Sequence, residues 1–382
     1  MKIIYINDAL AIWGGLERIV VDKVNELAAR YGYELFIVTS NQGNHPIPYP
    51  LNPKVVHRDL NIQFHQEYQY HGFQRLQKKM ELERLYARRL RDVVDQIKPD
   101  IIVCVRSEYI GTIVKVKGHV PLVFESHTSR FAHRFINADW YTKLRAFYNN
   151  RNVRLADCIV ALTDGDANDW REINRHIFVI PNIVNINATN SYCDYNSKSV
   201  IFVGRFCAQK DIDSLLHIWI IVHSRYPDWV LHIYGGYGEK LESQTQYISR
   251  LDANVVVHEP TCEILNCYKK SSMLLLTSVY EPFGLVLPEA MSCGLPVVSF
   301  DCPYGPADII TDGVDGFLIK NRDVQAFADR VCQLIEDKDL RVRMGQAAIK
   351  SSQRYRADLI MPKWKELFER LCRKELDTCS CR

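Results

Sequence analysis

Residues 278–298 read SVYEPFGLVLPEAMSCGLPVV, and this stretch decides how the chain around it folds. A short apolar run, Met273–Thr277, precedes it, and a second one, Val297–Phe300, begins at its end. Between the two, a polar loop leads into an apolar helix, and Pro288 is tolerated only in the first turn of a helix. The helix is therefore predicted to start near Leu285. The order strand, loop, helix, strand predicts one unit of a parallel sheet.

The rest of the chain repeats this alternation of short apolar runs with amphipathic stretches such as Ile19–Arg30 and Asp211–Ser224. Strands that are apolar on both faces indicate parallel sheets covered by helices on both sides. The pattern occurs twice, which predicts an α/β protein with two doubly wound domains. The expected strands are Lys2–Ile6, Glu34–Thr39, Ile101–Val105, Leu122–Glu125, Cys158–Leu162, Ile177–Ile180, Ser199–Val203, Val230–Tyr234, Val255–His258, Met273–Thr277, Val297–Phe300 and Phe317–Ile319.

Residues 182–198 are polar, rich in Asn and Ser, and without apolar periodicity, so they are predicted to link the two domains. We expect the first domain over residues 1–181, the second over residues 199–357, and a C-terminal helix and tail over residues 358–382. Within this last part, Asp358–Arg373 is amphipathic and is expected to pack back across the first domain. The apolar residues of this helix are Leu359, Trp364, Leu367, Phe368 and Leu371.

The composition is that of an ordinary globular protein, with 47% apolar and 24% charged residues among 382. The net charge is +3, with a mild basic excess in the first half, which suggests anionic partners and is too small to indicate nucleic acid. The sequence has no apolar run of about 18 residues, so no membrane-spanning helix is expected. Twelve scattered cysteines without a Cys-x-x-Cys pair favour free thiols, so a cytoplasmic protein is expected.

Ligands of doubly wound sheets lie beyond the carboxyl ends of the strands, where loops lead into helix N-termini. After the first strand, Gly14 and Gly15 precede a helix, which suits either the close approach of a phosphate or a plain tight turn. His127 follows the strand Leu122–Glu125. Its side chain would bond to a sugar hydroxyl or a phosphate, or it would cap the next helix.

Two cations, Arg205 and Lys210, bracket the loop that follows the strand Ser199–Val203. Arg supplies a rigid fork of N–H groups and Lys a mobile charge, so together they suit a diphosphate; two solvated surface charges are the simpler alternative. Negative charge grows on a departing nucleoside diphosphate. Cations at this place would therefore stabilise the transition state more than the ground state.

The segment quoted first adds two glutamates at different depths. Gly284 permits an open turn, in which its own amide and those of Phe283 and Leu285 would face an anion. Glu281 lies on the loop, and Glu289 lies about one turn inside the helix. Both are predicted to face one cleft, Glu281 near a sugar and Glu289 near a ribose, whose hydroxyls would satisfy a carboxylate in such an apolar helix.

Recognition of a nucleotide base is expected near the loops that end two further strands. Gly235 and Gly236 follow the strand Val230–Tyr234, and they allow either close approach of a ligand or a plain loop. His258 and Pro260 lie at the end of the next strand.

Together these residues resemble family 4 (group 1) of the retaining glycosyltransferases, which have the GT-B fold of two Rossmann-like domains facing a deep cleft. The likeness rests on residues 14–18, 204–210, 281–298 and 312–318, and it is strongest from residue 199 to residue 320. It implies transfer of a hexose from a nucleotide sugar, most often a UDP-sugar, with an α-linked product and without a metal ion. The acceptor would be a glycan or a lipid-linked glycan of a bacterial surface polysaccharide, such as capsule or lipopolysaccharide.

The resemblance also implies roles for single residues. Arg205 and Lys210 would hold the diphosphate, Glu281 would bind hydroxyls of the transferred sugar, and Glu289 would bind the ribose. His127 matches the family's histidine near that sugar. The residues expected to bind the nucleotide sugar are Gly14, Gly15, Gly204, Gly235, Gly236, His258, Pro260, Phe283, Gly284, Leu285 and Glu289.

Three alternatives remain open. Asp164-Gly165-Asp166 matches the metal-binding Asp-x-Asp motif of another glycosyltransferase fold, but it opens a helix, so capping of that helix is the preferred interpretation and no metal is assigned. A GT-B epimerase acting on the nucleotide sugar is a second enzyme class. An inactive subunit that only binds a nucleotide sugar is a third.

A membrane surface is a further possible partner. Phe73–Lys98 is a basic helical stretch with an apolar stripe, and a second group of basic and aromatic residues lies between Arg130 and Arg154. Such helices can lie on anionic lipid, whereas packing of the stripe on the sheet is the plainer alternative. The stripe is formed by Phe73, Leu76, Met80, Leu90, Val94 and Ile97.

Overall fold

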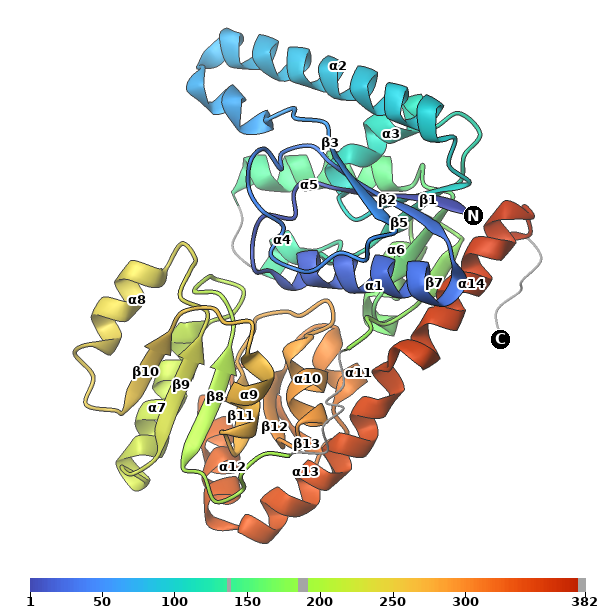
Figure 1. Ribbon diagram of the computed structural model, residues 1–382. Helices are drawn as coiled ribbons and strands as arrows, with labels where there is room; N and C mark the ends of the chain where they lie inside the picture. The colour runs from blue at the N-terminus through green and yellow to red at the C-terminus, as the bar shows by residue number, and fades with distance from the viewer. Residues whose placement is uncertain (136–138, 185–191, 377–382) are drawn as a thin grey trace.

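The computed structural model describes residues 1–135, 139–184 and 192–376, and these residues form two α/β domains (Figure 1). The sheet of the first domain has seven strands in the order β3-β2-β1-β4-β5-β6-β7, and every neighbouring pair is parallel. The order reverses between β1 and β4, which is where such sheets bind ligands. The strands are β1 (Lys2–Asn7), β2 (Glu34–Thr39), β3 (Val55–Asp59), β4 (Ile101–Cys104), β5 (Leu122–Glu125), β6 (Cys158–Ala161) and β7 (Ile177–Val179).

The second domain has a parallel sheet of six strands among the described residues, in the order β10-β9-β8-β11-β12-β13. Its order reverses between β8 and β11. The predicted fold of two doubly wound domains is therefore confirmed. The strands are β8 (Ser199–Val203), β9 (Val230–Tyr234), β10 (Val255–His258), β11 (Met273–Leu276), β12 (Val297–Asp301) and β13 (Gly316–Lys320).

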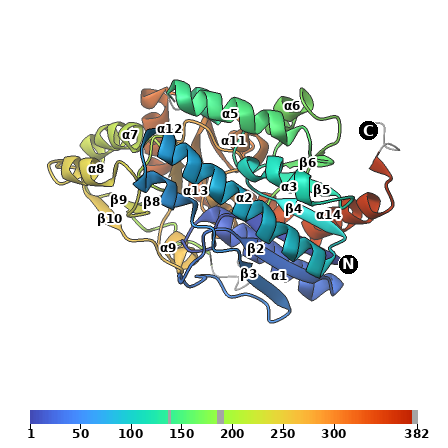
Figure 2. The ribbon, with the colours of Figure 1, turned by 90° about the horizontal axis from the view of Figure 1, so that it is seen from above.

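Helices cover both faces of each sheet (Figures 1 and 2). In the first domain they are α1 (Gly15–Tyr31), η1 (Phe64–Gln69), α2 (Gly72–Ile97), η2 (Ser107–Tyr109), α3 (Ile110–Val116), α4 (Ala132–Phe135), α5 (Trp140–Val153) and α6 (Asp164–Arg171). In the second they are α7 (Ile212–Arg225), α8 (Leu241–Ile248), α9 (Ile264–Lys269), α10 (Val286–Ser292), α11 (Gly305–Ile309), α12 (Val324–Glu336), α13 (Lys338–Ser352) and η3 (Gln353–Tyr355).

The last helix, α14 (Ala357–Cys372), runs from the second domain back to the first, as predicted (Figure 1). Its buried side chains, among them Trp364 and Phe368, join the core between α1 and the first sheet. The prediction was wrong for Leu359, which is 53% exposed because it lies on the outer face of the helix, whereas the next residues, Ile360 and Met361, are buried in the core of the first domain. The tail beyond residue 376, with Cys379 and Cys381, lies outside the described residues.

The predicted linker, residues 182–198, is described only in part, because residues 185–191 lie outside the described ranges. At its start the amide of Val184 donates to the carbonyl of Tyr355, and further on the amide of Cys193 donates to the carbonyl of Cys293, at 3.0 and 2.8 Å. The domain boundaries themselves stay predictions. Among the described helices, none combines the length and the apolar character that crossing a membrane requires.

Candidate functional site

The N-termini of two helices, one from each domain, meet where the domains touch (Figure 1). Helix α1 begins at Gly15, and a Cβ atom added to Gly15 would lie 3.4 Å from Cδ1 of Leu285, the residue that precedes α10. The predicted helix start near Leu285 is thus confirmed. Free amides and the positive end of a helix dipole favour an anion at such a place.

The turn before α10 leaves its amides available. Gly284 has φ = +89°, a conformation that residues with a side chain rarely adopt. Within the described residues, the amides of Phe283, Gly284 and Leu285 donate to no protein acceptor. The three amides therefore have the free hydrogens that the prediction for an anion requires.

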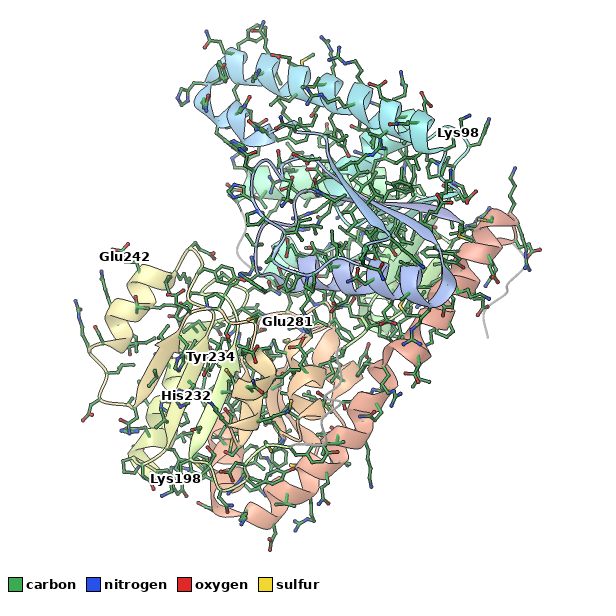
Figure 3. All side chains as sticks on the ribbon, viewed as in Figure 1. Lys98, Lys198, His232, Tyr234, Glu242 and Glu281 are labelled. Carbon is green, nitrogen blue, oxygen red and sulfur yellow. The ribbon has the colours of Figure 1, made fainter. Side chains whose placement is uncertain are left out.

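Glu281 lies on the loop above β11 and faces the first domain (Figure 3). Its side chain is 6% exposed; Oε1 accepts from Nζ of Lys210 and, at 2.7 Å, from Oγ of Ser278. The backbone is fixed as well, since the amide of Glu281 donates to Pro303 O at 3.1 Å and its carbonyl accepts from the amide of Gly305 at 2.7 Å. Lys210 and Glu281, both predicted site residues, are thus brought together. Ser278 was not predicted, although it precedes Glu281 by only three residues.

Glu289 lies in the first turn of α10, as predicted, and is 4% exposed. Its Oε1 accepts from Nη2 of Arg18, which belongs to the first domain, and the charge of Glu289 raises the pKa of Arg18. Its Oε2 accepts from the hydroxyl of Tyr268 at 3.3 Å. Neither partner was predicted, although Arg18 belongs to residues 14–18, on which the likeness to the family partly rests. A ribose at Glu289 would have to share or replace these bonds.

Arg205 and Lys210 lie on one loop after β8, as predicted, and Arg205 is exposed. This loop is tied to the loop of Glu281. The side-chain amide of Gln209 donates to the carbonyl of Tyr280 at 3.1 Å, and the carbonyl of Gln209 accepts from the amide of Val279 at 2.8 Å. The loop of the two cations and the loop of Glu281 are therefore held together.

Gly204 and Gly235 allow their two loops to pack closely against each other. Gly235 has φ = +144°, and a Cβ atom there would lie 2.1 Å from the carbonyl oxygen of Gly204. The amides of Gly235 and Gly236 both donate to the carbonyl of His258 at 3.2 Å, so they are already used within the protein. Contact of these glycines with a ligand stays a prediction.

Gly235→Ala is expected to destabilise the protein by about 1–3 kcal/mol, because the new side chain meets a backbone atom and the residue needs positive φ. Thermal denaturation measures this loss. Gly43→Ala is a suitable control: Gly43 also has positive φ, but no atom lies within 4 Å of its added Cβ. A Gly235→Ala protein no less stable than Gly43→Ala would contradict the steric account.

The imidazole of His258 stacks on the ring of Tyr234, with centroids 4.3 Å apart. Its Nε2 lies 2.9 Å from Nδ1 of His232, a residue that was not predicted, and burial lowers the pKa of both histidines. Figure 3 shows His232 and Tyr234 on the strands of the second domain. Pro260 follows on the next loop and is half-buried. This group lies beside the loop of Gly235, but nothing in it identifies a base.

His127 lies just beyond β5, at the same edge of the first sheet as Gly14. Its Nε2 is 2.9 Å from Oε1 of Glu125, and its side chain is 7% exposed. Among the described residues His127 makes no hydrogen bond to a helix amide, and the residue that caps α5 is Asp139. Its place at the strand end is as predicted, while its contact with a sugar stays a prediction.

The Asp-x-Asp segment opens α6, but the capping residue is Thr163, whose hydroxyl accepts from the amide of Asp166 at 3.3 Å. The expectation that an aspartate caps this helix was therefore wrong by one residue. Asp166 is buried, its Oδ2 accepts from Oγ of Ser126 at 2.8 Å, and burial raises its pKa to about 7. Asp164 instead contacts the second domain, since its amide donates to Asp308 at 3.1 Å.

Comparisons with known proteins agree with this fold. Residues 13–188 match the family described as Glycosyltransferase Family 4, and residues 193–351 match the one described as Glycosyl transferases group 1. The chain is 30% identical over 377 residues to the amylovoran biosynthesis glycosyltransferase AmsD of Erwinia amylovora, covering 96% of this chain and 99% of that protein. It is 32% identical over 228 residues to the poly(ribitol-phosphate) alpha-N-acetylglucosaminyltransferase of Staphylococcus aureus, covering 58% of this chain and 45% of that protein.

A solved structure shares the fold. TarM of S. aureus, crystallised with fondaparinux, alpha-GlcNAc-glycerol and UDP, superposes with a TM-score of 0.79 at 18% identity, covering 96% of this chain and 99% of that one. At this level of identity the likeness concerns the fold alone.

Proposed function

Because this chain belongs to family 4 (group 1) of the glycosyltransferases, we propose that it transfers a hexose from a nucleotide sugar, with UDP as the nucleotide, to a glycan or lipid-linked glycan of a bacterial surface polysaccharide. The anomeric configuration is retained, so the product is α-linked. The similarity to AmsD supports a role in polysaccharide synthesis, and the similarity to the S. aureus N-acetylglucosaminyltransferase supports the α-linkage. The TarM complex supports UDP as the nucleotide and a glycan as the acceptor.

The observation that carries the proposal is the pairing of each predicted glutamate with a cation where the domains meet. Lys210 holds Glu281, and Arg18 holds Glu289, beside the free amides that precede α10. A nucleotide sugar offers hydroxyls for both carboxylates and a diphosphate for the cations and amides. It therefore has partners for Glu281, Glu289 and the cations that hold them.

The chemistry follows from this arrangement. As the bond between sugar and phosphate breaks, charge grows on the departing diphosphate, and Arg205, Lys210 and the helix-end amides stabilise it without reorganising. A phosphate oxygen of the leaving group takes the proton of the acceptor hydroxyl as that hydroxyl attacks from the same face. In this scheme neither a nucleophilic side chain nor a metal ion is required.

UDP release tests the proposal. Incubation with UDP-hexoses should release UDP, slowly by hydrolysis without an acceptor and faster with one. Formation of a 2-epimer would instead favour an epimerase, and binding without any turnover would favour an inactive subunit. A thermal-shift screen should first identify the nucleotide sugar, since a ligand at 100 times its Kd stabilises by about 2.7 kcal/mol.

A membrane surface is proposed as a second partner, on the ground of apolar side chains that the fold leaves uncovered. The second half of the stripe on α2, with Leu90 and Val94, packs in the core, as the plainer alternative holds. Its first half extends beyond the sheet (Figures 1 and 2), and Phe73 and Leu76 are 71% and 53% exposed. On α5, Trp140, Phe147 and Tyr148 are exposed too. Basic residues lie among them, which suits anionic lipid.

Co-sedimentation with vesicles that contain anionic lipid is expected at low salt and should be reversed by high salt. Replacing Phe73 and Leu76 by serine should weaken this binding, because their exposed apolar surface would enter the lipid interface. The matched control replaces Tyr247 and Val256 by serine in the same way. These two side chains lie on the second domain and are 42% and 40% exposed. Equal binding of both double variants would refute the proposed surface.

A further inference from the structure

A buried ion pair lies beneath His127, and none of the roles proposed above uses it. The side chains of Lys23, on α1, and Glu125, the last residue of β5, are 1% and 0% exposed, and Nζ of Lys23 contacts Oε1 of Glu125. Burying two charges is costly even when they meet, and apolar residues of the same volume often serve stability equally well. The pair is therefore a candidate for a role other than stability.

The same carboxylate oxygen lies against His127. Nε2 of His127 is 2.9 Å from Oε1 of Glu125, and among the described residues no other acceptor contacts this nitrogen. Within the described residues, Oε2 of Glu125 has no hydrogen-bond partner. Lys23 and His127 thus share a single carboxylate oxygen.

This carboxylate keeps its charge near neutral pH. Burial alone would raise the pKa of Glu125, but the charge of Lys23 and the contact with His127 outweigh burial and lower this pKa to about 2. Glu125 is therefore ionised at neutral pH and faces Nε2 as an acceptor only. Of the two neutral tautomers of His127, an acceptor at Nε2 favours the one that carries its proton there, which leaves a lone pair on Nδ1.

We propose that Glu125 and Lys23 are positioning residues for His127. Glu125 keeps a ring proton on Nε2, and Lys23 balances the charge of Glu125. Nδ1 then accepts a hydrogen bond from a hydroxyl of the transferred sugar. This last step rests on the proposed function, whereas the state of the ring does not.

Other groups face this cluster from neighbouring elements. Burial, and next the charge of Glu125, raise the pKa of Tyr5 on β1 well above its ordinary value, so Tyr5 is neutral. The uncharged ring of Trp364 on α14 lies over the ammonium group, 4.3 Å from its centroid. Asp166 on α6, bonded to Ser126, has a pKa raised by burial to about 7. Because Asp166 titrates in the pH range of interest, it needs a control of its own.

The pH dependence of UDP release separates positioning from mere structure. Lys23→Met leaves the charge of Glu125 unbalanced beside the ring. As the pH is lowered, this variant should therefore lose activity at a higher pH than the natural protein does. Glu125→Gln removes that charge, so the loss should move to a lower pH. Each shift should amount to about one to three pH units. A purely structural role predicts no such opposite shifts.

Two controls accompany these variants. Lys117→Met removes a lysine that pairs with Asp157 at 3.1 Å, and Asp157 also binds the amide of Leu122 at the other end of β5. This variant should lose stability without moving the acid limb. Asp166→Asn should leave the difference between the Lys23 and Glu125 variants intact.

A second readout needs no turnover. The ¹⁵N shifts of the His127 ring, assigned by difference from His127→Gln, should show the proton on Nε2 in the natural protein and a mixture of tautomers in Glu125→Gln. These shifts, followed as a function of pH, report where the ring of His127 is protonated even if the proposed function is wrong. Acid limbs that move in the same direction, or a proton on Nδ1, would overturn the positioning role. Should Lys23→Met not fold, Glu125→Gln decides alone.

Discussion

Arg205→Ala is expected to lower kcat for UDP release about 10²–10³-fold and to leave Tm unchanged. Arg205 is exposed and, within the described residues, belongs to no ion pair, so its removal leaves no buried group unpaired. The diphosphate of a nucleotide sugar is already charged and gains further negative charge as the sugar departs, so the loss falls more heavily on the transition state than on the ground state. Steady-state kinetics and thermal denaturation measure the two effects separately.

Two variants make this result specific. Arg205→Lys keeps the charge but not the rigid fork of N–H groups, so its kcat should lie between those of Arg205→Ala and the natural protein. Arg250→Ala removes another exposed arginine of the second domain and should change nothing. If Arg205→Ala kept full kcat, or lost activity only in step with Tm, Arg205 would have no place at the diphosphate.

The fold was predictable because its signals are local. Each expected strand is a short apolar run between turn residues, and Pro288 alone was enough to place the start of α10. The strand β3 was missed because only Val55 of its five residues is buried and its remaining residues are half-buried or exposed, as at the edge of a sheet. Such a segment, VVHRD, has the composition of a loop.

The candidate site was predictable only in part, because its pairs join distant residues. The sequence places Glu281 and Glu289 on one loop and helix, but 271 positions separate Arg18 from Glu289, and 102 separate Lys23 from Glu125. No spacing rule reaches over such distances. Pairs of this kind depend on how the two domains and the strand edges meet, which a single sequence does not encode as a pattern.

The two glutamates should differ in what their loss affects. Glu281→Gln should lower kcat with little change in the affinity for UDP, because UDP lacks the transferred hexose that Glu281 would bind. Glu289→Gln should weaken UDP binding by about 10–100-fold, since a hydrogen bond to a charged group contributes about 1.5–3 kcal/mol. Titration calorimetry with UDP and steady-state kinetics with the UDP-sugar distinguish the two.

Arg18 makes this comparison sharper, because it is bound to Glu289 in the structure. If Glu289 acts by binding the ribose, Arg18→Ala frees its carboxylate and should preserve or raise the affinity for UDP. If Glu289 acts only by joining the two domains, Arg18→Ala should reproduce the loss seen with Glu289→Gln. Equal losses of kcat and affinity in Glu281→Gln and Glu289→Gln would count against separate roles. If Arg18→Ala raises the affinity for UDP, nucleotide binding is an exchange in which the ribose replaces Arg18 of the first domain as the partner of Glu289.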